Sequence, residues 1–241
     1  MENIVKQVNS PNGRSYETPS GVFPSVTTIL YKTKSERDKQ SLEDWRNRIG
    51  PAEADKISLS SRLDGTLMHN CIEGLLSWDD NALDMNRVGI KIAEDTSGAD
   101  KNRVSKFIQS WNTNVLPRIG QTYFIEKFGW NEKHGYAGAI DYGGEFDGIS
   151  SVIDWKNSLK IKKDSYLTDY KLQGSAYIGM VYRCPVFKDV PQIKQFVSVI
   201  MNDETDEPQV VIVPLKDILS TWFPMWELRC KAFHRMNSVN A

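Results

Sequence analysis

The chain has 241 residues, of which 40% are hydrophobic and 25% are charged. This composition excludes a disorder-dominated chain and predicts one soluble domain that is large enough to bury a full core. The 30 Lys and Arg residues nearly balance the 31 Asp and Glu residues. Any contact with nucleic acid must therefore come from local basic patches rather than from a global positive field.

The cysteine spacing and the hydropathy pattern predict where in the cell the protein is located. Cys71, Cys184 and Cys230 are far apart and form no CxxC pair. This spacing argues against a zinc ribbon and against a disulfide framework. No apolar run reaches the roughly 18 residues of a membrane span, and the first residues lack the charged-then-apolar layout of a signal peptide. We expect a soluble, intracellular protein.

The first half of the chain predicts an N-terminal arm followed by helices. Turn residues in segment 1–22 predict a loop or a short hairpin on the outside of the domain. Ser25 can cap a short helix over 26–30, although the β-branched residues there leave a strand open. Apolar residues at helical spacing predict an amphipathic helix over 41–49, helices over 52–63, 64–76 and 100–116, and a short helix around Ile90.

The period of the pattern changes in the second half. Alternating apolar residues predict three successive antiparallel strands over 121–128, 138–142 and 150–155. The remaining elements expected are a helix over 164–182, a hairpin over 192–201 and 209–214, and a terminal helix over 218–236 that is interrupted near Pro224. This order indicates an α/β (α+β) fold with one central mixed β-sheet flanked by helices.

Two carboxylates and a lysine stand in apolar, strand-like sequence. Asp141 ends the run Gly138-Ala-Ile-Asp141, and Asp154 and Lys156 follow a Val-Ile pair. Charges at the end of a buried strand need a partner or a catalytic role. Because side chains alternate along a strand, Asp154 and Lys156 share one face, and Asp141 can lie opposite them on the paired strand.

These residue types fit phosphodiester hydrolysis. Asp141, Asp154 and the backbone carbonyl of Trp155 offer oxygen ligands to a magnesium-like ion. Lys156 can orient or deprotonate the attacking water, or stabilise the charge that develops at phosphorus. The alternative interpretation is a surface salt bridge between Asp154 and Lys156 at the end of a strand.

The chain resembles a known nuclease family over about residues 23–182. The runs Gly138 to Asp141, Asp154 to Lys156 and Gln173 to Tyr177 look like the GxxD, (D/E)xK and QxxxY motifs of the PD-(D/E)xK nucleases, in their RecB-like branch. Pro24 to Thr27 and the Leu-x-x-Trp run at 42–45 match two further elements of that branch. Within it, the chain is similar to the mitochondrial genome maintenance exonucleases and to phage-encoded exonucleases. The resemblance implies a restriction-endonuclease-like core and DNA cleavage that depends on Mg²⁺ or Mn²⁺, with one or two ions.

The resemblance also implies roles for individual residues. It carries Asp141, Asp154 and Lys156 onto the metal-binding and catalytic positions. It carries His69, which follows Gly65-Thr66 on a helix before the sheet, onto a metal-ligand position. A nitrogen ligand among oxygens favours manganese somewhat over magnesium. Without the family, a helix-face histidine that meets a core carbonyl is the open alternative.

Gln173 and Tyr177 are four residues apart on a helix, so their side chains project from one face. In the family this pair lies beside the active site, where the amide contacts DNA or positions the lysine. Without the family, both are ordinary core residues.

Two acidic residues are accessory candidates. Glu126 is a further acid that can lie near the metals, although its alternation with Phe124 and Phe128 turns it toward the same side as these core residues. Glu73, one turn after His69, is a candidate partner for the second nitrogen of that imidazole. The alternative for Glu73 is a solvated helix residue.

Candidate DNA contacts are less specific. Lys160, Lys162 and Lys163 follow the catalytic strand and can contact a phosphate backbone, or form a solvated loop. Asn157 stands where the family usually has threonine. The iron-sulfur cluster of some relatives needs four cysteines, and the three scattered cysteines of this chain do not supply them. Several aromatic residues are candidates for stacking on unpaired bases, although most of them fit the core equally well. They are Trp45, Trp78, Trp130, Tyr136 and Trp155.

We therefore expect one nuclease domain, with an N-terminal arm over 1–22, a helical part over 23–118, a catalytic core over 119–182 and a C-terminal hairpin and helix over 183–241. The expected activity is that of a DNA exonuclease in replication, recombination or degradation, with preference for single-stranded ends. A phage-encoded protein of this kind would act in the host cytoplasm. The alternatives are a structure-specific endonuclease of the same fold and a catalytically silent nucleic-acid-binding module.

Overall fold

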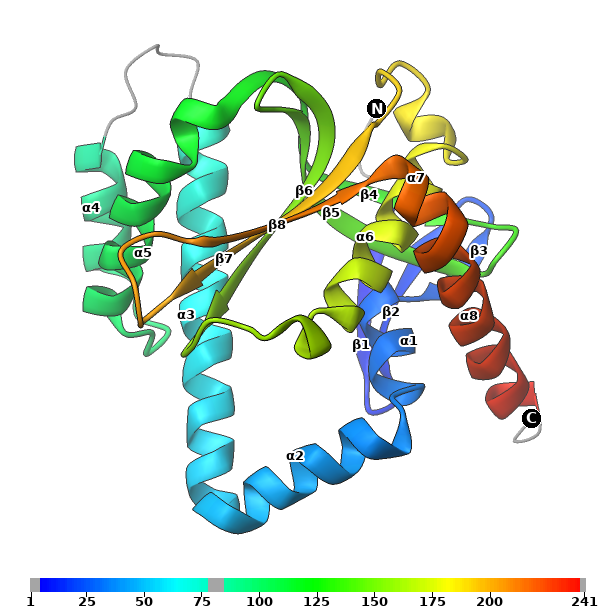
Figure 1. The fold of residues 1–241 in the computed structure, drawn as a ribbon, viewed down its shortest axis with the longest axis horizontal. Helices are drawn as coiled ribbons and strands as arrows, with labels where there is room; N and C mark the ends of the chain where they lie inside the picture. The colour runs from blue at the N-terminus through cyan, green and yellow to red at the C-terminus, as the bar shows by residue number, and fades with distance from the viewer. Residues whose placement is uncertain (1–4, 78–84, 239–241) are drawn as a thin grey trace.

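A mixed β-sheet lies between two layers of helices in the computed structural model, which describes residues 5–77 and 85–238 (Figure 1). Its strand order is β4-β5-β6-β7-β8, with β6 and β7 parallel and the other neighbours antiparallel. The strands are β4 (Ile119–Asn131), β5 (Tyr136–Phe146), β6 (Ile149–Ser158), β7 (Gln195–Asn202) and β8 (Gln209–Pro214). The predicted mixed sheet, the antiparallel β4-β5-β6 meander and the β7-β8 hairpin are confirmed.

Each face of this sheet packs against its own set of helices. One layer contains α3 (Pro51–Ser77), α4 (Met85–Glu94) and α5 (Lys101–Asn114). The other contains α1 (Val26–Lys32), α6 (Thr168–Val181) and α8 (Phe223–Ser238). Alternation along β6 sends Val152 into the α6 side of the core and Ile153 and Trp155 into the α3 side. Asp154 consequently lies on the α6 face of the sheet.

The N-terminal arm is a three-stranded antiparallel sheet, one strand more than the short hairpin expected. Its strands are β1 (Lys6–Ser10), β2 (Gly13–Thr18) and β3 (Gly21–Pro24). Tyr16 of β2 is buried, and its ring centroid lies 5.8 Å from that of Phe128. A bridge between Ser25 and Ala137 joins this segment to β5. Most residues of the arm are exposed or half-buried, and Tyr16 anchors it to the central sheet.

The predicted helices over 52–63 and 64–76 form one continuous helix, α3. Gly65, near the expected boundary, lies within it, and a β-carbon there would lie 3.1 Å from Asn157 Oδ1. Glycine is therefore used at this position for the close approach of α3 to the end of β6.

Helix α2 (Glu36–Ile49) begins after the N-cap Ser35 and connects α1 to α3 at the bottom of Figure 1. It contains no buried residue. The apolar spacing of Leu42, Trp45 and Ile49 does predict the helix, but the expected buried face is wrong because α2 packs against little else. The short helix at 26–30 is confirmed as α1, and the side chain of Ser25 accepts a hydrogen bond from the Thr28 amide.

The C-terminal helix is interrupted as expected. After α7 (Leu215–Asp217), residues Ile218–Trp222 form a π-helical turn, and α8 follows. Pro224 lacks an amide hydrogen, so it cannot continue a regular ladder from the preceding turn. No described helix combines the length and the hydropathy that a membrane-spanning segment requires.

Candidate active site

A pocket of about 380 Å³ opens where α3, the N-terminal sheet, β5 and β6 meet. It brings together residues that are far apart in the sequence but were predicted to form one site. The predicted site residues in the lining of this pocket are His69, Glu126, Asp141, Asp154, Lys156, Gln173 and Tyr177.

His69 projects into this pocket from the middle of α3. Its Nε2 lies 2.8 Å from the carbonyl oxygen of Trp155. Since the carbonyl can only accept, Nε2 carries the proton in this bond, and Nδ1 of the neutral ring has a free lone pair. Nδ1 lies 3.6 Å from Asp141 Oδ2 and 3.9 Å from Glu126 Oε1. The backbone of β6 thus orients the ring so that Nδ1 faces the two carboxylates.

Glu73 fits the alternative of a solvated helix residue rather than that of a partner for His69. Its side chain is an exposed group on the pocket wall, and the Trp155 carbonyl takes the place predicted for it beside the imidazole. The same carbonyl was predicted as a metal ligand, and in this structure its partner is His69.

Asp141 lies at the point where β5 and β6 separate. The β5-β6 ladder runs from Phe146–Ile149 to Tyr142–Ile153 and ends there, one residue before Asp141 and Asp154 would pair. Asp141 Oδ2 instead accepts a hydrogen bond of 2.9 Å from the Trp155 amide. The side chain thereby replaces the backbone partner that the diverging strand no longer supplies.

Glu126 reaches the site through a distorted strand. The β4-β5 register, with Ile125 beside Tyr142 and Lys127 beside Ile140, puts Glu126 opposite Asp141. Glu126 has a positive φ of 41°, a conformation that costs a residue with a β-carbon of the order of 1 kcal/mol or more. Regular alternation could not show that this residue belongs to the acidic cluster.

Asp154 and Lys156 share one face of β6, as alternation predicts. Lys156 Nζ lies 2.6 Å from Asp154 Oδ2 in an ion pair. No donor is directed at that buried oxygen with hydrogen-bond geometry. Gln173 Nε2 donates to Asp154 Oδ1 at 3.0 Å and to the Tyr177 hydroxyl at 2.7 Å. One carboxylate oxygen is thus held by α6, and the other faces the lysine and the pocket.

Burial and neighbouring charges shift the pKa values of these groups. Burial raises the pKa of Asp154 to about 6, although the Lys156 charge acts in the opposite direction. Burial lowers the pKa of His69, but the negative charge of Asp141 and the nearby Glu126 carboxylate outweigh it, so the net pKa is raised. For Lys156, burial is outweighed by Asp154 and Asp141, and the net pKa is raised. The cluster is arranged to keep positive charge close to its carboxylates.

The donor set fits a divalent cation. One atom each from His69, Glu126 and Asp141 lies within 4.8 Å of the others, and Asp154 Oδ2 is a buried oxygen without a hydrogen bond. Carboxylate oxygens with one imidazole suit Mg²⁺, Mn²⁺ and similar ions. These four residues are the ones that could hold such an ion.

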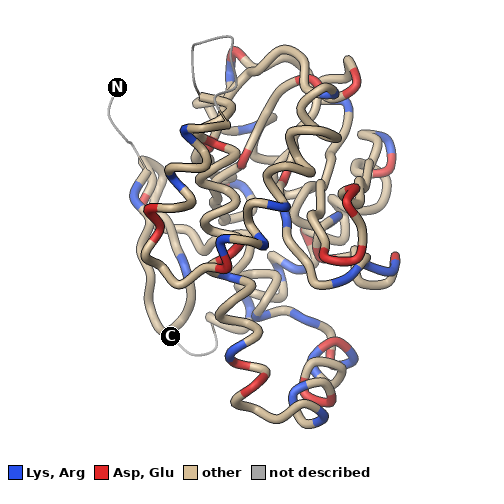
Figure 2. The backbone as a smooth tube through the Cα atoms, turned by 90° about the vertical axis from the view of Figure 1, so that its left-hand side faces the viewer, with Lys and Arg blue, Asp and Glu red and all other residues tan. Residues whose placement is uncertain are grey.

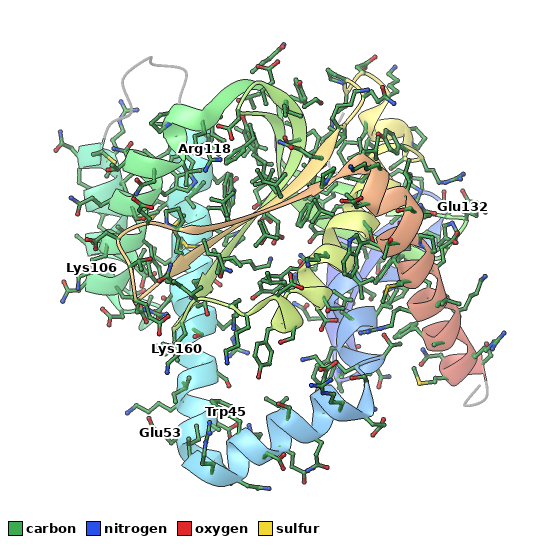
Figure 3. All side chains as sticks on the ribbon, viewed as in Figure 1. Trp45, Glu53, Lys106, Arg118, Glu132 and Lys160 are labelled. Atoms are coloured by element: carbon green, nitrogen blue, oxygen red, sulfur yellow. The ribbon has the colours of Figure 1, made fainter. Side chains whose placement is uncertain are left out.

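Other candidates lie elsewhere in the described residues. Lys160 and Lys162 are not among the lining residues of the pocket, and Lys160 lies just past the end of β6 (Figure 3). The backbone of Lys162 is hydrogen-bonded to the side chain of Gln209. Among the stacking candidates, Trp45 is half-buried on α2, and Trp78 lies outside the described residues (Figure 3). The core residues in that set are Trp130, Tyr136 and Trp155.

The pocket also contains residues that no sequence motif indicated. Arg14 and Gln7 of the N-terminal sheet form this part of its wall. They precede the catalytic motifs by more than a hundred residues, so only the packing of β2 and α1 against β5 brings them there. Charges of both signs alternate over the described backbone, so no single-sign region pointed to this wall (Figure 2).

Asn157, which stands at the usual threonine position, has a structural partner. Its Nδ2 donates a hydrogen bond of 2.9 Å to the Ser61 carbonyl on α3. The amide therefore ties the end of β6 to the helix that carries His69.

The chain is similar to two curated proteins, both called mitochondrial genome maintenance exonuclease 1. It is 28% identical to the mouse protein over 166 residues, which cover 66% of this chain and 44% of that protein. It is 28% identical to the human protein over 163 residues, which cover 66% of this chain and 43% of that protein. The chain spans less than half the length of these curated relatives.

Two further comparisons add little. No protein-family model matches the chain. A crystal structure from Eubacterium rectale, of a protein described provisionally as an exonuclease, matches 74% of this chain and 69% of its own with a TM-score of 0.45 and 15% identity. So weak a likeness supports no conclusion. The similarity to exonucleases that the motifs predicted is confirmed by the two curated relatives, and the RecB-like branch stays a prediction.

Proposed function

We propose that the chain is a metal-dependent DNA exonuclease that hydrolyses phosphodiester bonds, prefers single-stranded ends and acts in DNA replication, recombination or degradation. The observation that carries the proposal is the convergence of His69 Nδ1, Glu126 and Asp141 beside the Asp154–Lys156 pair in one pocket. The names of the two curated relatives support the same activity.

Each residue of the pocket has a distinct part in this proposal. His69, Glu126, Asp141 and Asp154 would hold the divalent ion, Mg²⁺ or Mn²⁺, as one ion or two. When bound, such an ion polarises a phosphoryl oxygen and makes a bound water more acidic. The Trp155 backbone fixes Asp141 through its amide and His69 through its carbonyl.

Lys156 supplies the positive charge next to the reacting phosphate. Its ion pair with buried Asp154 keeps the ammonium charged, and the charge can stabilise the additional negative charge that develops on the phosphoryl oxygens. Gln173 and Tyr177 are positioning residues, because their hydrogen bonds hold Asp154 and leave Oδ2 directed to the pocket.

The test is digestion of end-labelled single- and double-stranded oligonucleotides with Mg²⁺ or Mn²⁺, with one end blocked at a time. We expect shortening of single strands from a free end, and loss of cleavage in Lys156→Ala and Asp154→Ala. A circular single strand should stay intact, since an exonuclease needs an end. Undiminished cleavage by both variants would refute the site, and cleavage of the circle would refute the exonuclease activity.

A further inference from the structure

The N-terminal sheet contributes one cation, Arg14, to the lining of the pocket. The lining includes the carboxylates of Glu73, Glu126, Asp141 and Asp154. The permanently charged cations among its described residues are Lys156 and Arg14, and Lys156 is paired with Asp154. The Arg14 side chain makes no hydrogen bond or ion pair with any described residue. An anionic polymer that enters this acidic pocket therefore meets one free positive group on the N-terminal wall.

The backbone of Arg14 is fixed, although its side chain is exposed. Its amide donates a hydrogen bond of 3.0 Å to Thr28 Oγ1, and its carbonyl accepts bonds of 2.9 Å from Thr28 Oγ1 and from the Ser25 amide. Ser25 in turn bridges to Ala137 of β5, next to the Gly138 to Asp141 run. Arg14 is thus tied to the strand that carries Asp141.

Two neighbours set the direction in which Arg14 points. Gly13, with a φ of 116°, lies against Thr28, and a β-carbon there would come within 2.6 Å of Thr28 Cγ2. Only glycine accommodates this conformation and this contact together. Two residues further along β2, the Tyr16 side chain is buried and lines the pocket. Period-two alternation puts Arg14 on the same face of the strand as Tyr16, toward the pocket.

From these contacts we infer that Arg14 binds a phosphate group of the nucleic-acid strand and so fixes the strand relative to the metal ligands. The inference rests on the proposed function. A guanidinium has five donors in a planar fork that matches phosphate oxygens. Arg14 is a binding residue for the strand and takes no part in the bond cleavage itself.

The test compares Arg14→Gln with wild type by steady-state cleavage of a short single strand, with Arg235→Gln as matched control. Arg235 is exposed on α8 and does not line the pocket. Loss of one phosphate contact predicts a KM increase of about tenfold with kcat within about twofold, and a salt-dependence slope smaller by about 1. Arg14→Lys should recover part of the affinity, and the thermal midpoints of all variants should match wild type because the exposed Arg14 side chain makes no hydrogen bond or ion pair with the described residues.

Substrate variants identify the source of the phosphate. If the KM increase occurs only with 5′-phosphorylated or only with 3′-phosphorylated strands, Arg14 binds a terminal phosphate. If the KM increase is the same for phosphorylated and hydroxyl ends, Arg14 binds an internal diester. Equal KM values and salt slopes for Arg14→Gln and Arg235→Gln would overturn the inference.

A small substrate separates this inference from the proposed function. Bis(4-nitrophenyl) phosphate has a single phosphate, which the metal ligands would hold, so none is left for Arg14 and its hydrolysis should be equal in wild type and Arg14→Gln. Wild-type protein that hydrolyses neither this compound nor DNA would contradict the proposed function. The role of Arg14 in binding is then still tested by fluorescence anisotropy of a labelled single strand with Mn²⁺. Equal affinity of Arg14→Gln and Arg235→Gln would reject that role, and so would the absence of binding by wild type.

Discussion

Asp141 completes the hydrogen bonding of Trp155 across a gap in the sheet. Its Oδ2 accepts the Trp155 amide at 2.9 Å where the β5-β6 ladder has ended. The indole of Trp155 is buried on the opposite face, with its ring centroid 5.8 Å from that of Trp111 in an edge-to-face contact. The residue between Asp154 and Lys156 therefore anchors the strand in the α3–α5 layer while its backbone orients Asp141 and His69.

Asparagine at position 141 should separate the structural role of this carboxylate from its role toward a metal. Asp141→Asn keeps an oxygen that can accept the Trp155 amide, so we expect little loss of stability but loss of Mn²⁺ binding. Asp141→Ala should lose Mn²⁺ binding too and, because a buried amide is left unsatisfied, about 1–3 kcal/mol of stability. Isothermal titration calorimetry with Mn²⁺ and urea unfolding check the pair. Equal stability of the two variants would contradict the structural role.

Removal of the Lys156 charge should abolish catalysis without removing the metal ligands. For Lys156→Gln we expect kcat to fall about 10²- to 10³-fold, the loss typical when a charge-stabilising donor is removed. Mn²⁺ affinity should be kept, since the carboxylates lose a competing cation. Lys133→Gln, in the exposed turn between β4 and β5, is the matched control and should behave as wild type. A Lys156→Gln enzyme with wild-type kcat would exclude the proposed role.

The close contact of α6 with β7 should not tolerate a methyl group. A β-carbon at Gly174 would lie 2.2 Å from Cγ of the buried Phe196. Overpacking of this kind costs about 1–3 kcal/mol and should outweigh the helix-propensity gain of about 1 kcal/mol from Gly→Ala. We expect Gly174→Ala to be destabilised and less active, since Gln173 must move away from Asp154.

Gly89 on α4 is the matched control for this helix substitution. No atom of the described residues lies within 4 Å of a β-carbon placed there. Gly89→Ala should therefore gain up to about 1 kcal/mol from helix propensity alone. Chemical denaturation of both variants measures the difference, and a Gly174→Ala protein as stable as Gly89→Ala would disprove the tight α6–β7 contact.

Asp64 should be a major contributor to the stability of the α3–α5 layer. Its buried carboxylate lies 2.7 Å from Arg103 Nη1 and accepts the Asp100 amide at 2.7 Å. Asp64→Ala leaves a largely buried guanidinium without this partner, and the expected loss is about 3 kcal/mol. The same guanidinium also contacts Asp203, whose side chain is 36% exposed.

Asp203→Ala is thus a control within the same network. An ion pair of this exposure typically contributes less than about 1 kcal/mol, so Asp203→Ala should unfold close to wild type. Urea unfolding of both variants decides the matter. Similar losses for Asp64→Ala and Asp203→Ala would show that burial does not govern the strength of these two pairs.

The sequence by itself determined the strands and the chemistry carried on β6. Strict alternation sends Trp155 to one face and Asp154 and Lys156 to the other, and this local geometry depends only on the strand period. The period of apolar residues likewise predicted α5, α6 and the β4-β5-β6 meander, and Ser25 as a helix cap predicted α1. The apolar period predicted the helix α2 but not that few partners cover it, and it divided the continuous helix α3 into two.

Only the tertiary structure decided which groups meet. Glu126 joins the acidic cluster through a positive φ that interrupts the regular strand. The His69 ring is oriented by the Trp155 carbonyl, 86 residues away in the chain, rather than by its helix neighbour Glu73. Arg14 reaches the pocket because Tyr16 is buried against the central sheet. Periodicity fixes which side chains share a face within one element, whereas contacts between elements depend on burial summed over the whole core, which no local pattern records.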